Sequence, residues 1–364
     1  MPHPSQHEVF AFSLKILRDG ISARAFPGAS VALTLSGKLI ASEAFGRYTY
    51  DLDSPLATPH TIYDLASVSK VVATTTMAML LYERGELDLD TPVGAVLPEF
   101  AAAEVAANDP RRREITFRML LLHSSGLPGY ERLFERALTR EDLIRAALAL
   151  PLTADPGTRI EYSDVGFIVL GLALERLAGE PLECFCQREI FGPLGMAHTC
   201  FRPPASCRVA IPPTEDDRAF RGRVIQGEVH DENAWVMGGI AGHAGVFSTA
   251  NDVARFAAAI LSGGHPILRP DTVELFTRAV EIGGTRHALG WDVPTPPSQA
   301  GRLFSPRSFG HLGFTGTSLW IDPERQLSVT LLTNRTWPDR KSDAIRTVRP
   351  AFHDAVVQAV DKHL

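Results

Sequence analysis

The stretch Ser67-Val68-Ser69-Lys70 places a hydroxyl and an amine three residues apart at the start of an apolar run. Residues three apart on a helix share a face, so the Lys70 amine can reach the Ser67 hydroxyl. A serine needs an adjacent base to become a nucleophile, and a desolvated lysine with a lowered pKa can be that base. The spacing predicts nucleophilic catalysis at Ser67, whose N–H near a helix N-terminus would also help to hold an oxyanion. The alternative is a helix cap beside a surface cation.

The distribution of lysine favours the catalytic interpretation. Only five of the 36 basic residues are lysines, and Lys70 is the only one between positions 39 and 340. Arginine stays protonated, whereas the pKa of a lysine falls readily on burial. A solitary lysine in an arginine-rich chain therefore indicates a need for an amine that can release its proton.

Three ordered motifs carry a resemblance to a known family. They are Ser67-Val68-Ser69-Lys70, Tyr162-Ser163-Asp164 and His311-Leu312-Gly313, and the stretches ITFRMLLLHSSGLPGY and GEVHDENAWVMGGIAGHAGVF agree with them. Together they closely resemble the serine β-lactamase-like hydrolases, a family that contains class C β-lactamases, DD-peptidases and related esterases. The resemblance covers nearly all of the chain, from about residue 27 to residue 335.

The resemblance implies roles for the first two motifs. Ser67 would be the acyl-enzyme nucleophile and Lys70 its proton acceptor. Tyr162 would be the general base, or share the proton with Lys70, and a nearby cation would favour its phenolate. Asp164 replaces the usual asparagine: it accepts hydrogen bonds but cannot donate one to a substrate amide, and its charge should keep Lys70 protonated. This substitution shifts the preferred base toward Tyr162.

The third motif departs from the family's Lys-Thr-Gly. His311 still offers a donor or a proton, but Leu312 has no hydroxyl to bind a substrate carboxylate. Gly313 would let substrate lie close to the strand, and the N–H of Phe314 would be the second oxyanion donor. An alternative alignment on residues 314–316 restores a hydroxyl but removes the cation; we prefer the first.

The roles of one further cluster of polar residues and of one loop have alternative interpretations. The cluster could be read as a metal site, but the resemblance implies a segment that lines or braces the cleft of metal-free hydrolases, so neither a metal nor a cofactor is expected. The loop is interpreted as a capped turn. The cluster consists of His230, Asp231, Glu232 and His243, and the loop is His123-Ser124-Ser125.

Composition excludes several classes of protein. The net charge of −6 over 364 residues gives no electrostatic basis for nucleic-acid binding. No apolar run is long enough for a membrane span, and the N-terminal residues are expected to form an amphipathic helix rather than a signal peptide. The four cysteines lack metal-site spacing and are expected to be free thiols. We therefore expect a cytoplasmic protein with a small-molecule acyl substrate; a monomer is plausible, but the oligomeric state stays open.

Strand patterns occur at both ends of the chain and helical patterns between them. We expect a helix over 6–24, a hairpin over 28–48, strands at 286–293, 317–321 and 326–333, and a last helix from about 342 that Pro350 kinks or restarts. This pattern predicts an α+β fold, with an antiparallel sheet of five or more strands flanked by N- and C-terminal helices. Residues 1–63 and 285–364 would form a discontinuous sheet domain, residues 64–284 an inserted helical region, and the active site the cleft between them.

The residues and the resemblance together predict a serine hydrolase that acts on small esters or amides, most of all a carboxylesterase. The alternative within the family is a β-lactamase or a D-amino-acid or DD-peptidase. The alternative from another class is a catalytically silent binding protein that retains the cleft.

Overall fold

A five-stranded antiparallel sheet forms one side of the molecule. The computed structural model describes residues 6–102 and 109–364. The strand order β10-β11-β12-β1-β2 joins strands from the two ends of the chain, as the sequence predicted. The strands are β1 (Gly28–Leu35), β2 (Lys38–Gly46), β10 (Phe309–Leu312), β11 (Ser318–Asp322) and β12 (Leu327–Thr333).

The first hairpin and the central pairing explain this order. Ser36 and Gly37 both have positive φ, at 49° and 74°, which is the backbone geometry of a tight turn between twisted strands. The turn pairs β1 with β2, and the other edge of β1 pairs with β12, where Val31 lies opposite Leu331. Segments 300 residues apart in the sequence thus form the middle of the sheet.

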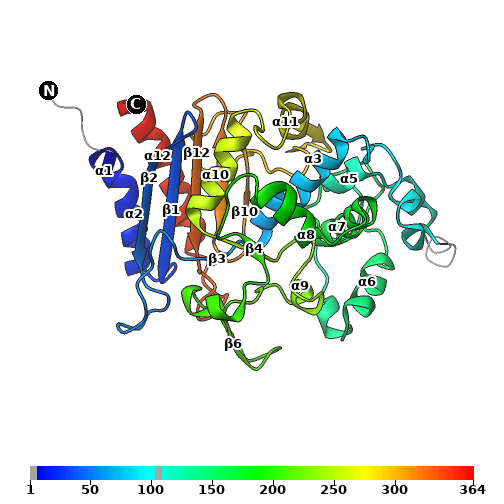
Figure 1. Cartoon of the computed structure of the whole chain (residues 1–364), viewed down its shortest axis with the longest axis horizontal. Coiled ribbons are helices and arrows are strands. Elements are labelled where there is room, and N and C mark those ends of the chain that lie inside the picture. Colours follow the sequence, from blue (N-terminus) through cyan, green and yellow to red (C-terminus); the bar gives the residue numbers. More distant parts are fainter. Residues whose placement is uncertain (1–5, 103–108) are drawn as a thin grey trace.

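Helices cover both faces of the sheet. Figure 1 shows α2 (Ala11–Ser22) and α12 (Ile345–His363) on one face and α10 (Ala250–Leu261) on the other. The first face buries Leu14 and Leu17 of α2 with Phe352 of α12, because their spacing places them on one stripe of each helix. The strand order leaves β10 at one edge of the sheet.

The chain between β2 and β10 is mostly helical. Its longest helix, α7, is almost entirely apolar and buried; the Ser163 hydroxyl caps its start, and Gly179, with φ of 68°, ends it. Besides α10, the α-helices in the described part of this region are α3 (Thr76–Glu83), α5 (Phe117–Leu121), α6 (Arg140–Leu148), α7 (Asp164–Ala178), α8 (Leu182–Cys186), α9 (Glu232–Val236) and α11 (Pro270–Thr277). Short strands complete this part: β3 (Tyr63–Asp64), β4 (Cys200–Phe201), β5 (Glu215–Asp217), β6 (Arg223–Ile225), β7 (Val246–Ser248), β8 (Val280–Ile282) and β9 (Thr285–His287).

The expected strand at 286–293 is wrong over most of its length. Only Thr285–His287 pairs, as β9 with β8, and the chain then turns so that the Trp291 N–H bonds to the Ala288 carbonyl. The turn needs Gly290, whose φ is 79° and whose missing Cβ would lie 2.1 Å from Thr75 Oγ1. One bridge, between residues 292 and 310, is all that reaches β10.

Both terminal helices differ in detail from the prediction. The first is divided into α1 (Gln6–Val9) and α2, whereas α12 runs through Pro350 without a restart. A proline cannot donate to the carbonyl four residues before it. The Gln299 side chain donates to that carbonyl, of Arg346, at 3.2 Å, so the helix loses no hydrogen bond there.

Two further features bear on the sequence-based expectations. Cys184, Cys186, Cys200 and Cys207 are free thiols. Within residues 6–102 and 109–364, no helix combines the length and the apolar character that crossing a bilayer requires. The division of the chain at residues 63/64 and 284/285 stays a prediction.

Candidate active site

Ser67 lies on a strained turn between β3 and the helix that contains Lys70. The turn Ala66–Val68 is a 3₁₀ helix, and Lys70 begins a π-helical segment that leads into α3. Ala66 has a φ of 46°, a conformation that is costly for a residue other than glycine and clusters at functional sites. The Asp64 carboxylate stabilises it by accepting the Ala66 N–H at 2.8 Å and the His230 N–H at 2.6 Å.

Lys70 is fully buried and makes three hydrogen bonds. Its Nζ donates to Ser67 Oγ at 3.0 Å, to Asp164 Oδ1 at 2.6 Å and to the His243 carbonyl at 2.9 Å. These three acceptors match the three hydrogens of an ammonium group. Burial lowers the pKa of Lys70, and the Asp164 carboxylate opposes that shift. The two effects expected for Lys70, desolvation and retention of its charge by Asp164, are therefore both present and opposed.

Tyr162 forms a wall of the same site. The residue as a whole is 42% exposed, and Lys70 Nζ lies over the ring, 4.9 Å from the centroid. Burial of the hydroxyl, followed by the charge of Asp164, raises the pKa of Tyr162 well above its usual value. The expectation that a nearby cation favours the phenolate is therefore wrong, because these two effects outweigh the cation. The resting Tyr162 is a neutral phenol.

His123 fixes the position of this tyrosine, a role that the sequence did not indicate. Its Nδ1 accepts the Ser163 N–H at 3.0 Å, and its ring centroid lies 4.7 Å from that of Tyr162. Since Nδ1 is an acceptor, the proton is on Nε2, and burial holds the pKa of His123 well below its ordinary value. His123 also has a positive φ of 54°. The HSSG stretch suggested only a capped turn.

The third motif follows the edge strand β10. His311 Nδ1 donates to the Leu312 carbonyl at 2.8 Å, so its Nε2 is an acceptor. Burial and the charge of Lys70 lower the pKa of His311 to about 3. The expectation that His311 offers a donor or a proton is therefore wrong: the ring is neutral and presents a lone pair.

Two threonine hydroxyls join the end of β10 to the nucleophile. Thr315 donates to the Asp64 carbonyl and Thr317 to the Leu65 carbonyl, both at 2.8 Å. Because the Thr315 hydroxyl is buried in this contact, it cannot meet a substrate, which favours the alignment on residues 311–313. A Cβ on Gly313 would lie 1.9 Å from Thr317 Oγ1, so the glycine permits this close approach. The contact brings Phe314 and Ser67 to the wall of one pocket.

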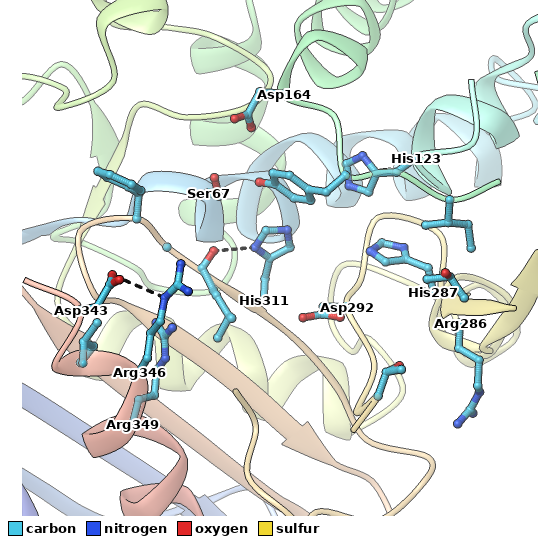
Figure 2. A pocket seen from close by; sticks show the side chains of 18 of the residues that line it. Ser67, His123, Asp164, Arg286, His287, Asp292, His311, Asp343, Arg346 and Arg349 are labelled. Atoms are coloured by element: carbon cyan, nitrogen blue, oxygen red, sulfur yellow. Dashed lines mark hydrogen bonds and ion pairs between the residues drawn. The ribbon is translucent and has the colours of Figure 1, made fainter. Parts of the chain in front are cut away.

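The pocket at the nucleophile, called the main pocket below, has a volume of about 620 Å³. Figure 2 shows His311 beside Ser67, with His123 and His287 to one side and Arg346 and Arg349 to the other. The pocket thus has histidines on one side of Ser67 and arginines of α12 on the other. It brings together these predicted site residues: Ser67, Tyr162, Asp164, His311, Gly313 and Phe314, with Lys70 buried directly behind.

A second cavity of about 260 Å³ shares Ser67, Asp164 and Phe314 with the first. Its other walls contain the charged cluster seen in the sequence, which is arranged as one pair and one connected chain of ion pairs through Arg340. His243 Nε2 lies 2.8 Å from Asp231 Oδ1. The other contacts are those of His230 with Glu215 at 2.7 Å and of Arg340 with Glu232 at 2.8 Å. Across the described ranges, no group of three or more acidic, histidine or cysteine side chains is placed to hold a metal ion.

Comparison with known proteins agrees with this geometry. The sequence model of the family described as Beta-lactamase matches residues 15–351. The chain belongs to this family. A protein of Escherichia coli K12 named "Putative D-alanyl-D-alanine carboxypeptidase" is 31% identical over 85% of the chain and 79% of its own length. An "N-acetylmuramyl-L-alanine amidase" of Bacillus subtilis is 32% identical over 86% and 78%.

Solved structures share the fold. EstCE1, described as a hydrolase with promiscuous acyltransferase activity, superposes with a TM-score of 0.75 at 24% identity, covering 97% of this chain and 99% of its own. A simvastatin synthase mutant from Aspergillus terreus gives 0.75 at 22% identity, with 97% and 100% covered. The β-lactamase-like chain is therefore a serine hydrolase with the antiparallel sheet and helical region of its relatives.

Proposed function

We propose that the protein hydrolyses small esters through an acyl-enzyme on Ser67. The observation that carries this is the position of Lys70 Nζ, which lies between Ser67 Oγ and Asp164 Oδ1 at the wall of a large pocket. The Ser67 oxygen attacks the substrate carbonyl, and the N–H groups of Ser67 and Phe314 hold the resulting oxyanion. No cofactor is required for any of these steps.

The hydrogen bonds of Lys70 provide a route for the protons. As Ser67 attacks, Lys70 passes one proton to Asp164 and its freed lone pair accepts the proton of Ser67. The phenol of Tyr162 then protonates the leaving group, and Lys70 returns a proton to Tyr162. A water molecule reverses these transfers and releases the acid. Asp164 and Lys70 thus act as one proton-holding pair.

Esters are the preferred substrates for two reasons. Asp164 cannot donate a hydrogen bond to a substrate amide, and Leu312 offers no hydroxyl to a substrate carboxylate. The test compares kcat/KM for short p-nitrophenyl esters with that for nitrocefin, on wild type and Ser67→Ala. We expect faster ester turnover and no turnover by Ser67→Ala; much faster nitrocefin hydrolysis would contradict the preference.

A second candidate, a peptidase that releases a C-terminal amino acid, has one specific observation in its favour. Arg349 lines the pocket almost buried, with its NH groups bonded to the Thr317 carbonyl and the Gln299 side-chain oxygen. Burial lowers its pKa to about 10, so a substrate carboxylate would stabilise its charge. The names of the relatives support this candidate. Turnover of acyl-D-Ala-D-Ala above that of its methyl ester would establish it.

Two further hypotheses, a catalytically silent binding protein and a cytoplasmic location, are tested separately. Fluorophosphonate labelling of wild type but not of Ser67→Ala would exclude a catalytically silent binding protein. A cytoplasmic location stays a prediction, which fractionation of cells that express the full chain tests.

A further inference from the structure

The second cavity adjoins the nucleophile but differs in character from the main pocket. A carbonyl held at Ser67 has an acyl side and a leaving-group side, and two cavities that meet at Ser67 can hold one each. Tyr162, which protonates the leaving group in the proposed mechanism, lines the main pocket and does not line the second cavity. The second cavity is therefore the place for the acyl group.

The charged residues in this cavity's wall are mainly acidic. Asp164, Asp231 and Glu232 face one cation, Arg340. That arginine is occupied, because it bonds to Glu232 at 2.8 Å and to Glu215 at 2.9 Å. Lys70 likewise neutralises Asp164. The carboxylate of Asp231 is then the one in this wall that has no lysine or arginine within ion-pair distance in the described ranges.

Asp231 has an oxygen available for a ligand. Both of its hydrogen bonds, from the Ala234 N–H and from His243 Nε2, reach Oδ1. Although burial raises the pKa of Asp231, the hydrogen bonds from His243 Nε2 and from the Ala234 N–H bring it below its ordinary value, so the group is ionised at neutral pH. Its side chain is 20% exposed, at the wall of the cavity.

The partner of Asp231 provides a second acceptor. His243 also lines the cavity, its side chain is 1% exposed, and its Nδ1 is buried without a partner among the described residues. A neutral imidazole that donates from Nε2 leaves Nδ1 as an acceptor. A buried acceptor without a donor is costly, so a ligand with several N–H groups fits this wall.

The electrostatic potential in the second cavity is negative. After burial, the charges of Asp231 and Glu232 are the main causes that raise the pKa of Tyr130, another wall residue. Tyr130 also presents an exposed aromatic ring, and such rings attract cations. An anionic acyl group would be repelled here.

We propose that this cavity binds a primary ammonium group on the acyl part of the substrate, with Asp231 as its counter-ion and His243 as a second acceptor. The enzyme would thus prefer aminoacyl esters to neutral acyl esters. This inference rests on the proposed acyl-enzyme function. It assigns the substrate class that the catalytic residues alone leave open.

A pair of substrates that differ only in the charged group tests the proposal. Alanine ethyl ester and ethyl isobutyrate have the same shape, because a methyl group replaces the ammonium. We would measure kcat/KM for D- and L-alanine ethyl ester and for ethyl isobutyrate on wild type and Asp231→Asn. An ammonium ester is intrinsically more reactive, so the deciding quantity is the change in the ratio between the two proteins.

The ratio for at least one enantiomer should fall about tenfold or more in Asp231→Asn, the loss typical of a charge-assisted hydrogen bond. Asparagine caps a helix as well as aspartate does, so α9 keeps its N-cap. Asp90→Asn, at a surface ion pair with Arg118, is the matched control and should leave the ratio unchanged.

Each other outcome has one meaning. An unchanged ratio in Asp231→Asn, or turnover of ethyl isobutyrate without turnover of either alanine ester, overturns the ammonium site while the acyl-enzyme function stands. Absence of all turnover together with absence of fluorophosphonate labelling of Ser67 overturns the proposed function, and the ammonium site with it. Circular dichroism of Asp231→Asn identifies a variant that has lost its fold; Asp231→Glu, which keeps the charge, should then retain a preference for the ammonium ester.

Discussion

Asp164 Oδ1 lies 2.6 Å from Lys70 Nζ, and only the aspartate has any exposed surface. This chain therefore holds an ion pair at the position where the resemblance implied an asparagine. The pair keeps a proton within reach of Ser67. It also removes the donor that would meet a substrate amide.

Lysine at position 70 cannot be replaced by arginine. Arginine does not release its proton and is too large for a site with no exposed surface, so we expect Lys70→Arg to lower kcat for a p-nitrophenyl ester by about 10²-fold or more. The same substitution at the exposed Lys15, which pairs with Asp19, is the control and should have no effect. Retention of wild-type kcat by Lys70→Arg would exclude proton transfer through this group.

Asp164→Asn should shift selectivity toward β-lactams. The variant restores an amide donor, and one neutral hydrogen bond corresponds to roughly a three- to tenfold change in relative rate. We therefore expect the ratio of kcat/KM for nitrocefin to that for p-nitrophenyl acetate to rise by about this factor. A constant ratio would mean that Asp164 does not meet the acyl amide, and Asp90→Asn provides the baseline.

His123 is expected to act through Tyr162. His123→Ala removes the acceptor of the Ser163 N–H and the ring that packs on Tyr162, so kcat for p-nitrophenyl acetate should fall about tenfold with a smaller change in KM. Asparagine tolerates positive φ and offers an acceptor oxygen, so His123→Asn should recover part of the loss. His60→Ala, at an exposed site, is the control. Equal losses in His123→Ala and His123→Asn would argue against positioning through the Ser163 hydrogen bond.

Buried neutral histidines should make the protein sensitive to acid. Burial and the charge of Arg349 lower the pKa of His353, between α12 and the sheet, to about 3, well below the ordinary value near 6.5. Below pH ~6.5, His353 therefore binds a proton in the unfolded chain but not in the folded chain. Stability present above pH ~6.5 is lost as the pH falls. We expect His353→Gln to reduce the slope of the free energy of unfolding against pH by about 1.4 kcal/mol per pH unit between pH ~6 and ~4.

Urea titrations across this range give the slope. Because Gln keeps a polar group beside Ser318, the variant should remain folded at neutral pH. His60→Gln, at an exposed position, should leave the slope unchanged. An equal slope in wild type and His353→Gln would show that His353 accepts a proton in the folded state.

Local sequence patterns predicted the elements that depend on residues close together in the sequence. Alternating residues and the Ser36-Gly37 turn sufficed for β1 and β2, and the Ser67–Lys70 spacing predicted a contact that is present at 3.0 Å. The false strand at 286–293 has the right residue types, but Trp291 enters the core through a turn at Gly290 that packs directly against Thr75, more than 200 residues away. No local pattern carries that information.

The site shows the same limit. The three motifs indicated which residues meet, whereas the contacts of His123 with Ser163 and of Thr315 with Asp64 depend on long-range packing. The protonation states also depended on that packing: burial, which spacing does not reveal, decides that Tyr162 and His311 are neutral. The pairing of His243 with Asp231 was likewise beyond the sequence, although both residues were recognised as a cluster.

The pairing of β1 with β12 delays formation of the sheet during synthesis of the chain. Strand β1 leaves the ribosome early and must wait for Leu327–Thr333 before its second edge is covered. At ordinary elongation rates of roughly 5–20 residues per second, that interval is on the order of 15–60 s. Thr315 and Thr317, which bind the backbone beside the nucleophile, are likewise synthesised long after Ser67. A nascent chain that stops before β12 therefore carries Ser67 without a working site, and the hydrolase can become active only after Leu327–Thr333 has been made.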